Sequence, residues 1–108
     1  MLSLAIVVVM TRVALDAHIV DRLMRDLVSH DHAPSSFLLY LYLWRWTRGR
    51  GREQHGASLQ ELATHTGLSK SSVQNALRNL KRRGLVTARK PAPTAACFYE
   101  VHETWRRS

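Results

Sequence analysis

The spacing of small, flexible and apolar residues between Ser58 and Leu80 constrains the fold more than any other feature of the chain. Ala63 is a small residue in the first apolar-periodic stretch, Gly67 follows four positions later, and Val73 follows six positions after that. Two helices that cross closely need a small residue at the crossing, and the turn between them needs a residue that tolerates a positive φ angle. The spacing therefore predicts two short helices joined by a tight turn, with Val73 facing the core.

Polar caps and a glycine mark the ends of these two helices. Ser58 and Glu61 have the S-x-x-E spacing of a capping box, which predicts the start of the first helix. Ser69 is the expected N-cap of the second helix, which ends near Arg83 with Gly84 as its stop. The apolar residues of the second helix recur at i, i+3, i+4 and i+7, which predicts one buried face. These residues are Val73, Ala76, Leu77 and Leu80.

Two further helices are expected before this pair. Residues 14–30 are predicted to form an amphipathic helix, because apolar residues recur there at i+4 steps. These apolar residues are Leu15, Ile19, Leu23 and Leu27. A second helix is expected from its N-cap Ser35 to about Thr47. Its residues are apolar on nearly every side, so one face is expected to pack on the core and the other to be covered by the first helix or by a second subunit.

The remaining segments are expected to be a loop, a hairpin and an N-terminal arm. Residues 48–57 hold three glycines and three arginines and are predicted to form a loop. Residues 85–90 and 96–101 are predicted to pair as a hairpin, since proline is confined to the connection between them. The apolar run Ile6–Val9 is typical of a strand or a packed arm, although translation from Met10 would leave it out of the protein.

The order of these elements predicts the fold class. Helix, helix, turn, helix and hairpin is the order of a winged helix-turn-helix, so the chain is expected to be mainly α with a small β-hairpin and an extra N-terminal helix. Residues 1–34 are interpreted as an N-terminal arm and helix, a candidate dimerisation element. Residues 35–108 are interpreted as the winged helix-turn-helix domain.

The charge of the chain is strongly asymmetric. The formal net charge is +8, and residues 1–34 carry three arginines against four aspartates. Residues 35–108 carry the other 13 bases against four acids. Such a balance favours a polyanionic partner, either nucleic acid or an acidic surface. Thirteen of the 16 bases are arginine, which suits forked contacts to phosphate or guanine, although a GC-rich genome produces the same bias.

The polar face of the second helix of the pair is the candidate DNA-binding surface. No acidic residue lies between Gly67 and Arg89, where an acid would repel phosphate. Gln and Asn can pair with adenine and Arg with guanine in the major groove, while Ser and Lys near a helix start can meet phosphate. The candidate residues are Ser69, Lys70, Ser71, Ser72, Gln74, Asn75, Arg78, Lys81, Arg82, Arg89 and Lys90.

Several of these candidates have a second interpretation. The bases at the end of the helix, such as Lys81 and Arg82, also suit the negative end of its dipole. Arg89 and Lys90 lie at the expected wing tip, where an ordinary basic turn is equally consistent with the sequence. The arginines of the 48–57 loop are further candidates for nonspecific phosphate contacts. The whole polar face is also compatible with a helical hairpin that serves protein–protein contacts.

The stretch SLQELATHTGLSKSSVQNALRNLKRRGLV (58–86) resembles the core of winged-helix transcriptional regulators of the MarR-like and GntR-like groups. It also resembles the helix-turn-helix domains of plasmid and phage replication proteins, and SSFLLYLYLW (35–44) resembles the helix before the motif in that group. The resemblance covers roughly residues 35–101. It implies a winged-helix fold, DNA binding and often a homodimer, with 71–78 on the recognition helix and 89–90 on the wing. Because no effector domain or replication-protein remainder is recognised, no small-molecule ligand is expected.

Other chemistries have little support in the sequence. His30, Asp31 and His32 are interpreted as a polar helix-ending loop, since no complete metal-ligand set has the usual spacing. Cys97 is the single cysteine, so no disulfide can form within the chain, which fits a reducing, cytoplasmic setting. The residues of a phosphate loop, a nucleophile elbow or a carboxylate pair are missing. We therefore expect no enzyme activity, no cofactor, no metal and no membrane association.

The sequence thus predicts a sequence-specific double-stranded DNA-binding protein, a transcriptional regulator of prokaryotic type acting as a homodimer. Two alternatives stay open at this point. The chain could be a replication-accessory or nucleoid-like DNA-binding protein with the same fold. It could also use the winged helix as a protein-interaction module, in which case DNA binding would be weak and nonspecific.

Overall fold

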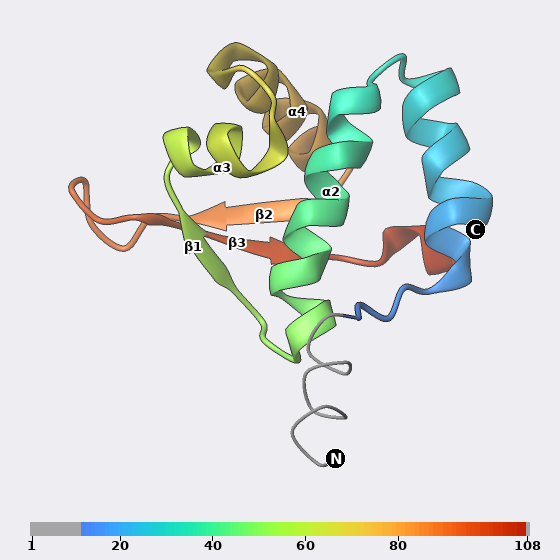
Figure 1. The fold of residues 1–108 in the computed structure, drawn as a ribbon, viewed down its shortest axis with the longest axis horizontal. Coiled ribbons are helices and arrows are strands. Elements are labelled where there is room, and N and C mark those ends of the chain that lie inside the picture. Colours follow the sequence, from blue (N-terminus) through green and yellow to red (C-terminus); the bar gives the residue numbers. More distant parts are fainter. Residues whose placement is uncertain (1–11, 108) are drawn as a thin grey trace.

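A computed structural model of the protein describes residues 12–107, and Figure 1 shows how its helices and strands are arranged. The first helical segment contains two π-helical stretches, Ile19–Leu23 and Asp26–His30, and residues 17–30 are called the N-terminal helical segment below. The other elements are α2 (Pro34–Trp46), a 3-10 turn (Arg48–Arg50), β1 (His55–Ala57), α3 (Leu59–Thr66), α4 (Lys70–Arg82), β2 (Val86–Arg89), β3 (Cys97–Val101) and a second 3-10 turn (Thr104–Arg107). The expected mainly α fold with a hairpin after the helices is confirmed. The arm expected at Ile6–Val9 lies outside the described residues.

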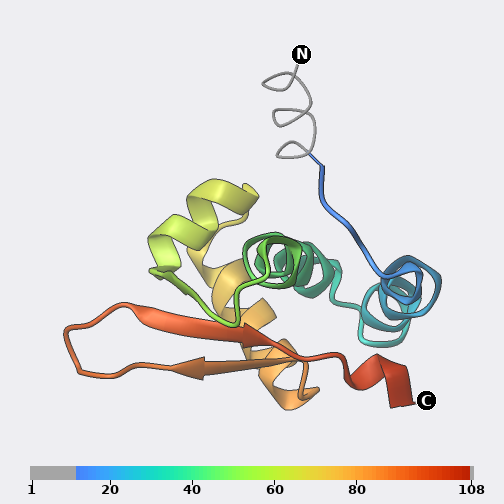
Figure 2. The ribbon, with the colours of Figure 1, turned by 90° about the horizontal axis from the view of Figure 1, so that it is seen from below.

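The helix α2 is buried on more than one face, as its composition predicts. Figure 2 shows it nearly end-on, with the N-terminal helical segment on one side and α3 on the other. Four of its side chains are fully buried: Ser36, Leu39, Tyr40 and Leu43. The N-terminal helical segment covers α2 with three buried side chains, which are Ile19, Leu23 and Leu27. Each buried leucine or isoleucine contributes roughly 1.5–3 kcal/mol to folding, so this segment belongs to the core.

The C-terminal turn closes the same core. The Tyr40 hydroxyl donates to the His102 carbonyl oxygen at 3.0 Å and accepts a hydrogen bond from Trp105 Nε1 at 2.9 Å. Trp105 is only 4% exposed, and Trp44 Nε1 donates to the Ala14 carbonyl oxygen at 2.8 Å. The two tryptophans therefore act as core anchors with their polar nitrogens satisfied.

The start of α2 and the start of the N-terminal helical segment differ from the sequence-based expectations. Ser35 is not the N-cap of α2: Ala33 occupies that position without a side-chain cap, and Pro34 is the first helical residue. Proline is favoured there because its missing N–H would have no helical partner. Leu15 is 43% exposed, because it lies in the extended chain before the first helical turn.

The sheet has one strand more than the expected hairpin. The strand order is β1-β3-β2, and both pairings are antiparallel. Residues 55–57, expected as part of a loop, form β1, with Gly56 opposite Phe98. A side chain at position 56 would meet the Phe98 ring at 2.8 Å, so the close pairing needs a glycine. A three-residue strand with a central glycine has no alternation of apolar and polar residues, which is why the loop prediction was wrong.

Within residues 12–107, no helix has the length and apolar character needed to cross a membrane.

Candidate nucleic-acid interface

The helix α3 starts with the capping box that the sequence predicts. Ser58 Oγ accepts the Glu61 backbone N–H at 3.1 Å, and Glu61 Oε1 accepts the Ser58 backbone N–H at 3.1 Å. Hydrogen bonds that the carboxylate accepts from the Ser58 backbone and side chain lower the pKa of Glu61 below its ordinary value. The carboxylate is therefore engaged in holding the helix start.

The turn between α3 and α4 confirms the predicted crossing of the two helices. Gly67 has a φ of 79° and donates its N–H to the Ala63 carbonyl oxygen at 2.9 Å. Ala63 is 7% exposed and Val73 is fully buried, so both lie in the contact between the helices. Ser69 caps α4, since its Oγ accepts the Ser72 N–H at 3.1 Å. The turn and cap together fix the direction in which α4 leaves α3.

The helix α4 has one buried face and one polar face. Its buried residues are Val73, Ala76, Leu77 and Leu80, as predicted. Its exposed residues include seven candidates, which are Lys70, Ser71, Gln74, Asn75, Arg78, Lys81 and Arg82. Ser72 is half-buried, and its hydroxyl bonds with Ser69 Oγ at 2.9 Å. The side chains of two candidates, Ser69 and Ser72, are therefore engaged in hydrogen bonds that stabilise the start of α4.

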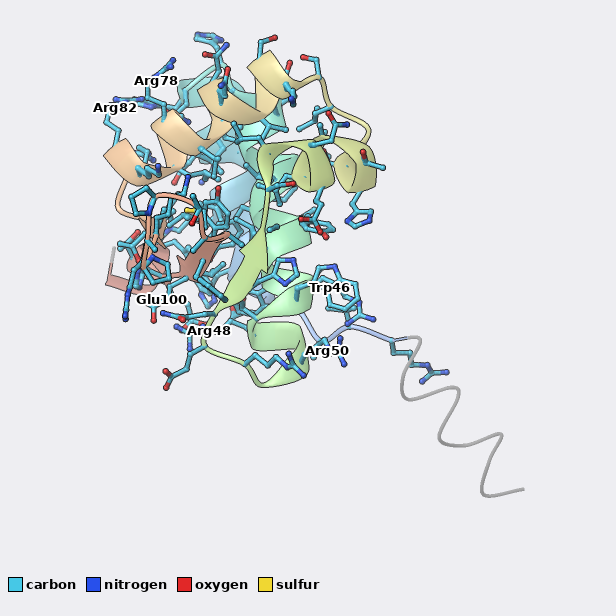
Figure 3. All side chains as sticks on the ribbon, turned by 90° about the vertical axis from the view of Figure 1, so that its left-hand side faces the viewer. Trp46, Arg48, Arg50, Arg78, Arg82 and Glu100 are labelled. Atoms are coloured by element: carbon cyan, nitrogen blue, oxygen red, sulfur yellow. The ribbon has the colours of Figure 1, made fainter. Side chains whose placement is uncertain are left out.

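Two of the candidate base-reading side chains are bonded to each other. Arg78 Nη1 donates to Asn75 Oδ1 at 2.9 Å. An asparagine that pairs with adenine needs its amide oxygen as an acceptor, so Asn75 is ready for that role only after Arg78 releases it. Gln74 makes no side-chain hydrogen bond with the described residues, and its amide is free. Figure 3 shows Arg78 and Arg82 on the outer side of α4.

A groove lies between α4 and the wing, which we define as β2, β3 and the connection between them. Its main part has a volume of about 490 Å³ and is lined by residues that include Gln74, Arg78, Lys81, Lys90, Cys97 and Tyr99. An adjoining part of about 340 Å³ brings Lys70 beside Lys90 at the start of α3. Every charged residue that lines the two parts is basic. This α4–wing groove therefore offers four cationic side chains and a free amide on one concave surface.

The wing contributes unequally to the groove. Lys90 lines both parts of it, whereas Arg89, the last residue of β2, lines neither. Lys90 is the first residue of the connection that follows β2. Sequence reasoning missed Tyr99 and Cys97, because only the register of β3 shows which of its residues face α4. Burial and a hydrogen bond with Cys97 raise the pKa of Tyr99, so its hydroxyl stays protonated at neutral pH.

The end of α4 is fixed to the segment that precedes α2. The Asp31 side chain is 3% exposed, and its Oδ2 accepts Asn79 Nδ2 at 3.2 Å and pairs with Arg83 Nε at 3.2 Å. Burial alone raises the pKa of Asp31, but hydrogen bonds from His30 and Asn79 and the charge of Arg83 lower it overall. Asn79 also donates to Ser36 Oγ at 3.1 Å. We call this set the Asp31 junction, and it serves to hold α4 in place.

The junction also bears on two bases at the end of α4. Arg82 Nη2 donates to Asn79 Oδ1, so this candidate is partly held by the helix. The ion pair with Asp31 gives Arg83 a structural role. Sequence reasoning missed the burial of Asp31, since a carboxylate between two histidines gives no sign of packing. Across the described part of the chain, no three or more His, Cys, Asp or Glu residues form a group that could hold a metal ion.

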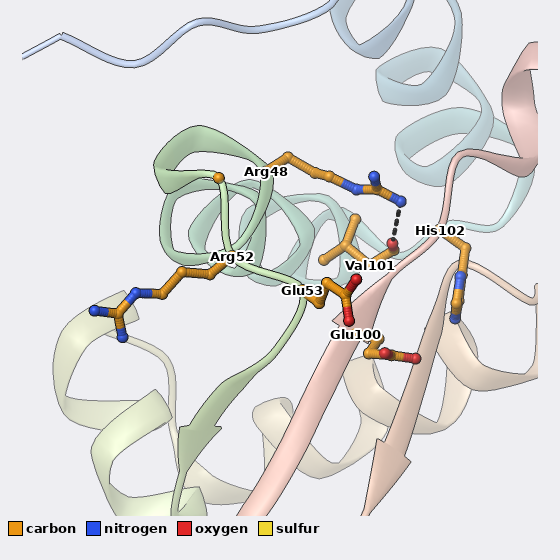
Figure 4. Close-up of a pocket in the computed structure, with 7 residues that line it drawn as sticks. Arg48, Arg52, Glu53, Glu100, Val101 and His102 are labelled. Atoms are coloured by element: carbon orange, nitrogen blue, oxygen red, sulfur yellow. Dashed lines mark hydrogen bonds between the residues drawn. The ribbon is translucent and has the colours of Figure 1, made fainter.

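A further cavity, beside the end of β3, has a different character. It measures about 520 Å³, and Figure 4 shows Arg48, Glu53, Glu100 and His102 around it. Arg48 Nη2 donates to the Val101 carbonyl oxygen at 3.1 Å, so this loop arginine braces β3. Two carboxylates at this cavity oppose phosphate binding. The α4–wing groove, by contrast, has no acid among the described residues that line it.

The fold and the groove define a helix-turn-helix domain, a class of domains that bind DNA. The family model described as "Helix-turn-helix domain" matches residues 33–86, which is half of the chain, and the protein belongs to this family. The match covers α2, β1, α3 and α4 and ends at the first residue of β2. No curated protein matches the chain.

Proposed function

We propose that the protein is a sequence-specific double-stranded DNA-binding transcriptional regulator of the winged-helix type, similar to the MarR-like and GntR-like groups. The observation that carries this proposal is the α4–wing groove, because all its charged lining residues are basic. A concave surface with cations on two elements fits the phosphates on either side of a DNA groove. Such a regulator acts on DNA in the cytoplasm.

In this proposal α4 is the recognition helix and enters the major groove by its N-terminal half. Arg78 pairs with guanine, and Gln74, whose amide is free, pairs with adenine. Asn75 orients Arg78 through their 2.9 Å hydrogen bond. Lys70, Ser71 and Lys81 contact phosphates around these bases, and phosphate contacts position the helix without reading sequence. Ser69 and Ser72 act by fixing the helix start.

The wing is proposed to contact the DNA backbone next to the recognition helix. Lys90 lies in the groove with Lys70, so one phosphate can meet both side chains. Arg89 is exposed on the other side of the strand and reaches the adjacent minor groove or its phosphates. Arg82 adds a peripheral contact once its guanidinium leaves Asn79. These roles predict that wing substitutions lower affinity for all sequences alike.

We propose that the regulator acts as a homodimer through the outer face of the N-terminal helical segment. Three apolar residues of that segment, Val20, Met24 and Val28, are between 39% and 46% exposed and lie four residues apart. Exposed apolar residues in a row are typical of contact surfaces. A twofold dimer would place two recognition helices about one DNA turn apart, roughly 34–36 Å.

The experiment is selection of bound duplexes from a randomised pool at about 150 mM salt, followed by sequencing. The proposal predicts an enriched motif, palindromic if a dimer binds. Arg78→Ala is expected to relax the preference at one position of the motif by roughly 1–3 kcal/mol. Binding that is blind to sequence and fades with salt would contradict specific regulation and favour the nucleoid-like or protein-interaction alternatives.

A further inference from the structure

A cluster of aromatic and basic side chains lies outside the α4–wing groove, at the C-terminal end of α2. We call it the Trp46 cluster, and its members are Tyr42, Arg45, Trp46, Arg50, His55 and His65. The guanidinium carbon of Arg45 lies 4.6 Å from the centre of the Trp46 ring, and that of Arg50 lies 5.0 Å from it. The His55 ring stacks on Trp46 at 5.8 Å with an angle of 19°. The half-buried Trp46 indole therefore contacts two arginines and a histidine.

The cluster joins four elements of the fold. Tyr42 lies on α2, its ring is 5.8 Å from that of His65 on α3, and its hydroxyl is 2.9 Å from His65 Nδ1. The same tyrosine meets the edge of His55 on β1 at 5.9 Å. Arg50 comes from the turn that follows α2. Contacts between residues so far apart in sequence show that the arrangement is built by the fold.

The two arginines of the cluster have no carboxylate of their own within residues 12–107. Neither Arg45 nor Arg50 forms an ion pair with any carboxylate of residues 12–107. The acid that acts on Tyr42 and His55 is Glu61, whose carboxylate already accepts the Ser58 N–H. Burial lowers the pKa of His55, and the charges of His65, Arg50 and Arg52 lower it further against the opposing effect of Glu61. Two arginines held on one ring repel each other unless an anion joins them.

The strand β1 connects the Trp46 cluster to the α4–wing groove. The strand β1 starts at His55 in the cluster and ends at Ala57, which lines the groove beside Lys70 and Lys90. Two residues of strand span about 7 Å, which is close to the spacing of successive phosphates along one DNA strand. Figure 3 shows Trp46 and Arg50 well away from Arg78 and Arg82, on the side where α3 lies.

We propose that the Trp46 cluster is a second phosphate-binding site, which holds the DNA backbone beyond the base pairs that the α4–wing groove reads. This inference rests on the proposed DNA-binding function. Arg45 and Arg50 supply the guanidinium N–H donors, and Trp46 holds both groups in place, so that less freedom is lost when phosphate binds. His55 and His65 add donors at the edge of the site. Duplex DNA is the partner because two guanidinium groups without a carboxylate partner among residues 12–107 complement phosphate, and because β1 connects the cluster to the α4–wing groove.

The test is the affinity of the full-length protein for a duplex carrying its selected motif and for a scrambled duplex, measured by fluorescence anisotropy between about 50 and 300 mM salt. The double variant Arg45→Gln/Arg50→Gln is expected to bind both duplexes about tenfold more weakly at 150 mM salt. The slope of log affinity against log salt is expected to shrink by about 1.8, or 0.9 for each lost phosphate contact. The ratio between the two duplexes stays unchanged, because phosphate contacts read no sequence.

Two further variants separate a local site from bulk charge. Arg12→Gln/Arg25→Gln removes the same charge from two exposed arginines of the N-terminal part and is expected to leave affinity and slope close to wild type. Trp46→Leu keeps both arginines but removes their platform. It is expected to weaken binding about two- to fivefold, the size of an exposed cation–π contact, with its fold checked by circular dichroism.

The outcomes distinguish this inference from the proposed function. Wild-type affinity and salt slope in the Arg45→Gln/Arg50→Gln variant, which changes only side chains at the surface, would overturn the second site while leaving DNA binding intact. The same result combined with lost binding to poly-glutamate would overturn it in favour of an acidic protein partner. Failure of the wild-type protein to bind either duplex would instead overturn the DNA-binding function, and this inference with it.

Discussion

At the scale of single residues, the polar side chains of α4 divide into those held by the fold and those free to meet DNA. Ser69 and Ser72 complete the helix start, and Asn79 completes the Asp31 junction. Lys70, Gln74 and Lys81 make no hydrogen bond or ion pair through their side chains with the described residues. The division separates residues whose loss lowers stability from residues whose loss lowers affinity.

The cap of α4 gives the clearest stability prediction at this scale. Ser69→Ala removes the acceptor of the Ser72 N–H and is expected to lower the free energy of unfolding by about 1 kcal/mol. Ser35→Ala is the matched control, because Ser35 lies inside α2 and caps nothing, so a change within about 0.5 kcal/mol is expected. Urea denaturation followed by circular dichroism measures both. An equal loss of unfolding free energy in the two variants would contradict the assignment of Ser69 as the cap of α4.

The structural role of a residue could be predicted from sequence wherever that role depends on neighbours in the chain. The capping box of Ser58 and Glu61 and the positive φ of Gly67 are of this kind, because the partners lie within four residues. The hydrogen bond between Arg78 and Asn75 is also local. It depends on the rotamers of both side chains, which the sequence does not specify. The burial of Asp31 could not be predicted, since its partners Asn79 and Arg83 lie about fifty residues away.

At the scale of elements, the Asp31 junction determines how α4 is seated. The helix is fixed at its start by the turn from α3 and at its end by a buried carboxylate that meets Asn79 and Arg83. In the proposed role of α4 as the recognition helix, fixing both of its ends would keep its polar side chains in a constant position and limit the entropy lost on binding. The junction also links α4 to the N-terminal helical segment, which ends at His30.

The junction is expected to make stability depend on pH in a defined direction. The pKa of Asp31 in the folded protein is below its ordinary value of 3.8, so its stabilising contribution is full above that value and is lost as pH falls through the lowered pKa. Asp31→Asn is expected to cost roughly 1–3 kcal/mol at pH 7 and progressively less toward pH 2.

Urea denaturation across this pH range measures the difference between wild type and Asp31→Asn. Asp21→Asn, at an exposed aspartate, serves as the control and is expected to differ little from wild type. A difference in unfolding free energy between wild type and Asp31→Asn that stays constant from pH 7 to pH 2 would contradict a stabilising role of the ionised Asp31 carboxylate.

The elements themselves were predictable to different degrees. The helices α3 and α4 have local caps and a regular apolar period, and their bounds agree with expectation to within one residue. The π-helical stretches keep the apolar residues at i+4 steps on one face, so the sequence pattern indicated Ile19, Leu23 and Leu27 correctly, whereas Leu15 lies before the helical segment and is exposed. The strand β1 depends on its pairing with β3 and left no pattern in the sequence.

At the scale of the whole molecule, charge and apolar surface are separated. Six of the bases line the α4–wing groove and the Trp46 cluster, while the exposed apolar stripe of Val20, Met24 and Val28 lies on the N-terminal helical segment. Figure 1 shows this segment on the opposite side of α2 from α3 and the wing. A dimer formed through the stripe would therefore leave both grooves open to DNA.

The dimer is best tested with point substitutions in the stripe. Deletion of the N-terminal residues would also remove Ile19, Leu23 and Leu27 from the core, so a loss of dimer would be ambiguous. Val20→Glu/Val28→Glu is expected to give a folded monomer in light scattering, because four buried glutamates at a twofold contact are strongly unfavourable. Leu38→Glu, at a 49% exposed position of α2, is expected to leave the dimer intact. A stripe variant that stays dimeric would show that the contact lies elsewhere.

The central claim is that the α4–wing groove is the DNA-binding surface. It is tested most directly by the backbone amide NMR shifts of the wild-type protein on addition of a duplex carrying the selected motif. We predict that the largest changes fall on the N-terminal half of α4, on the turn at Gly67–Ser69 and on the wing around Lys90, with a smaller set at the Trp46 cluster. Changes centred on the Glu53–Glu100 cavity, with α4 and the wing unaffected, would contradict the claim.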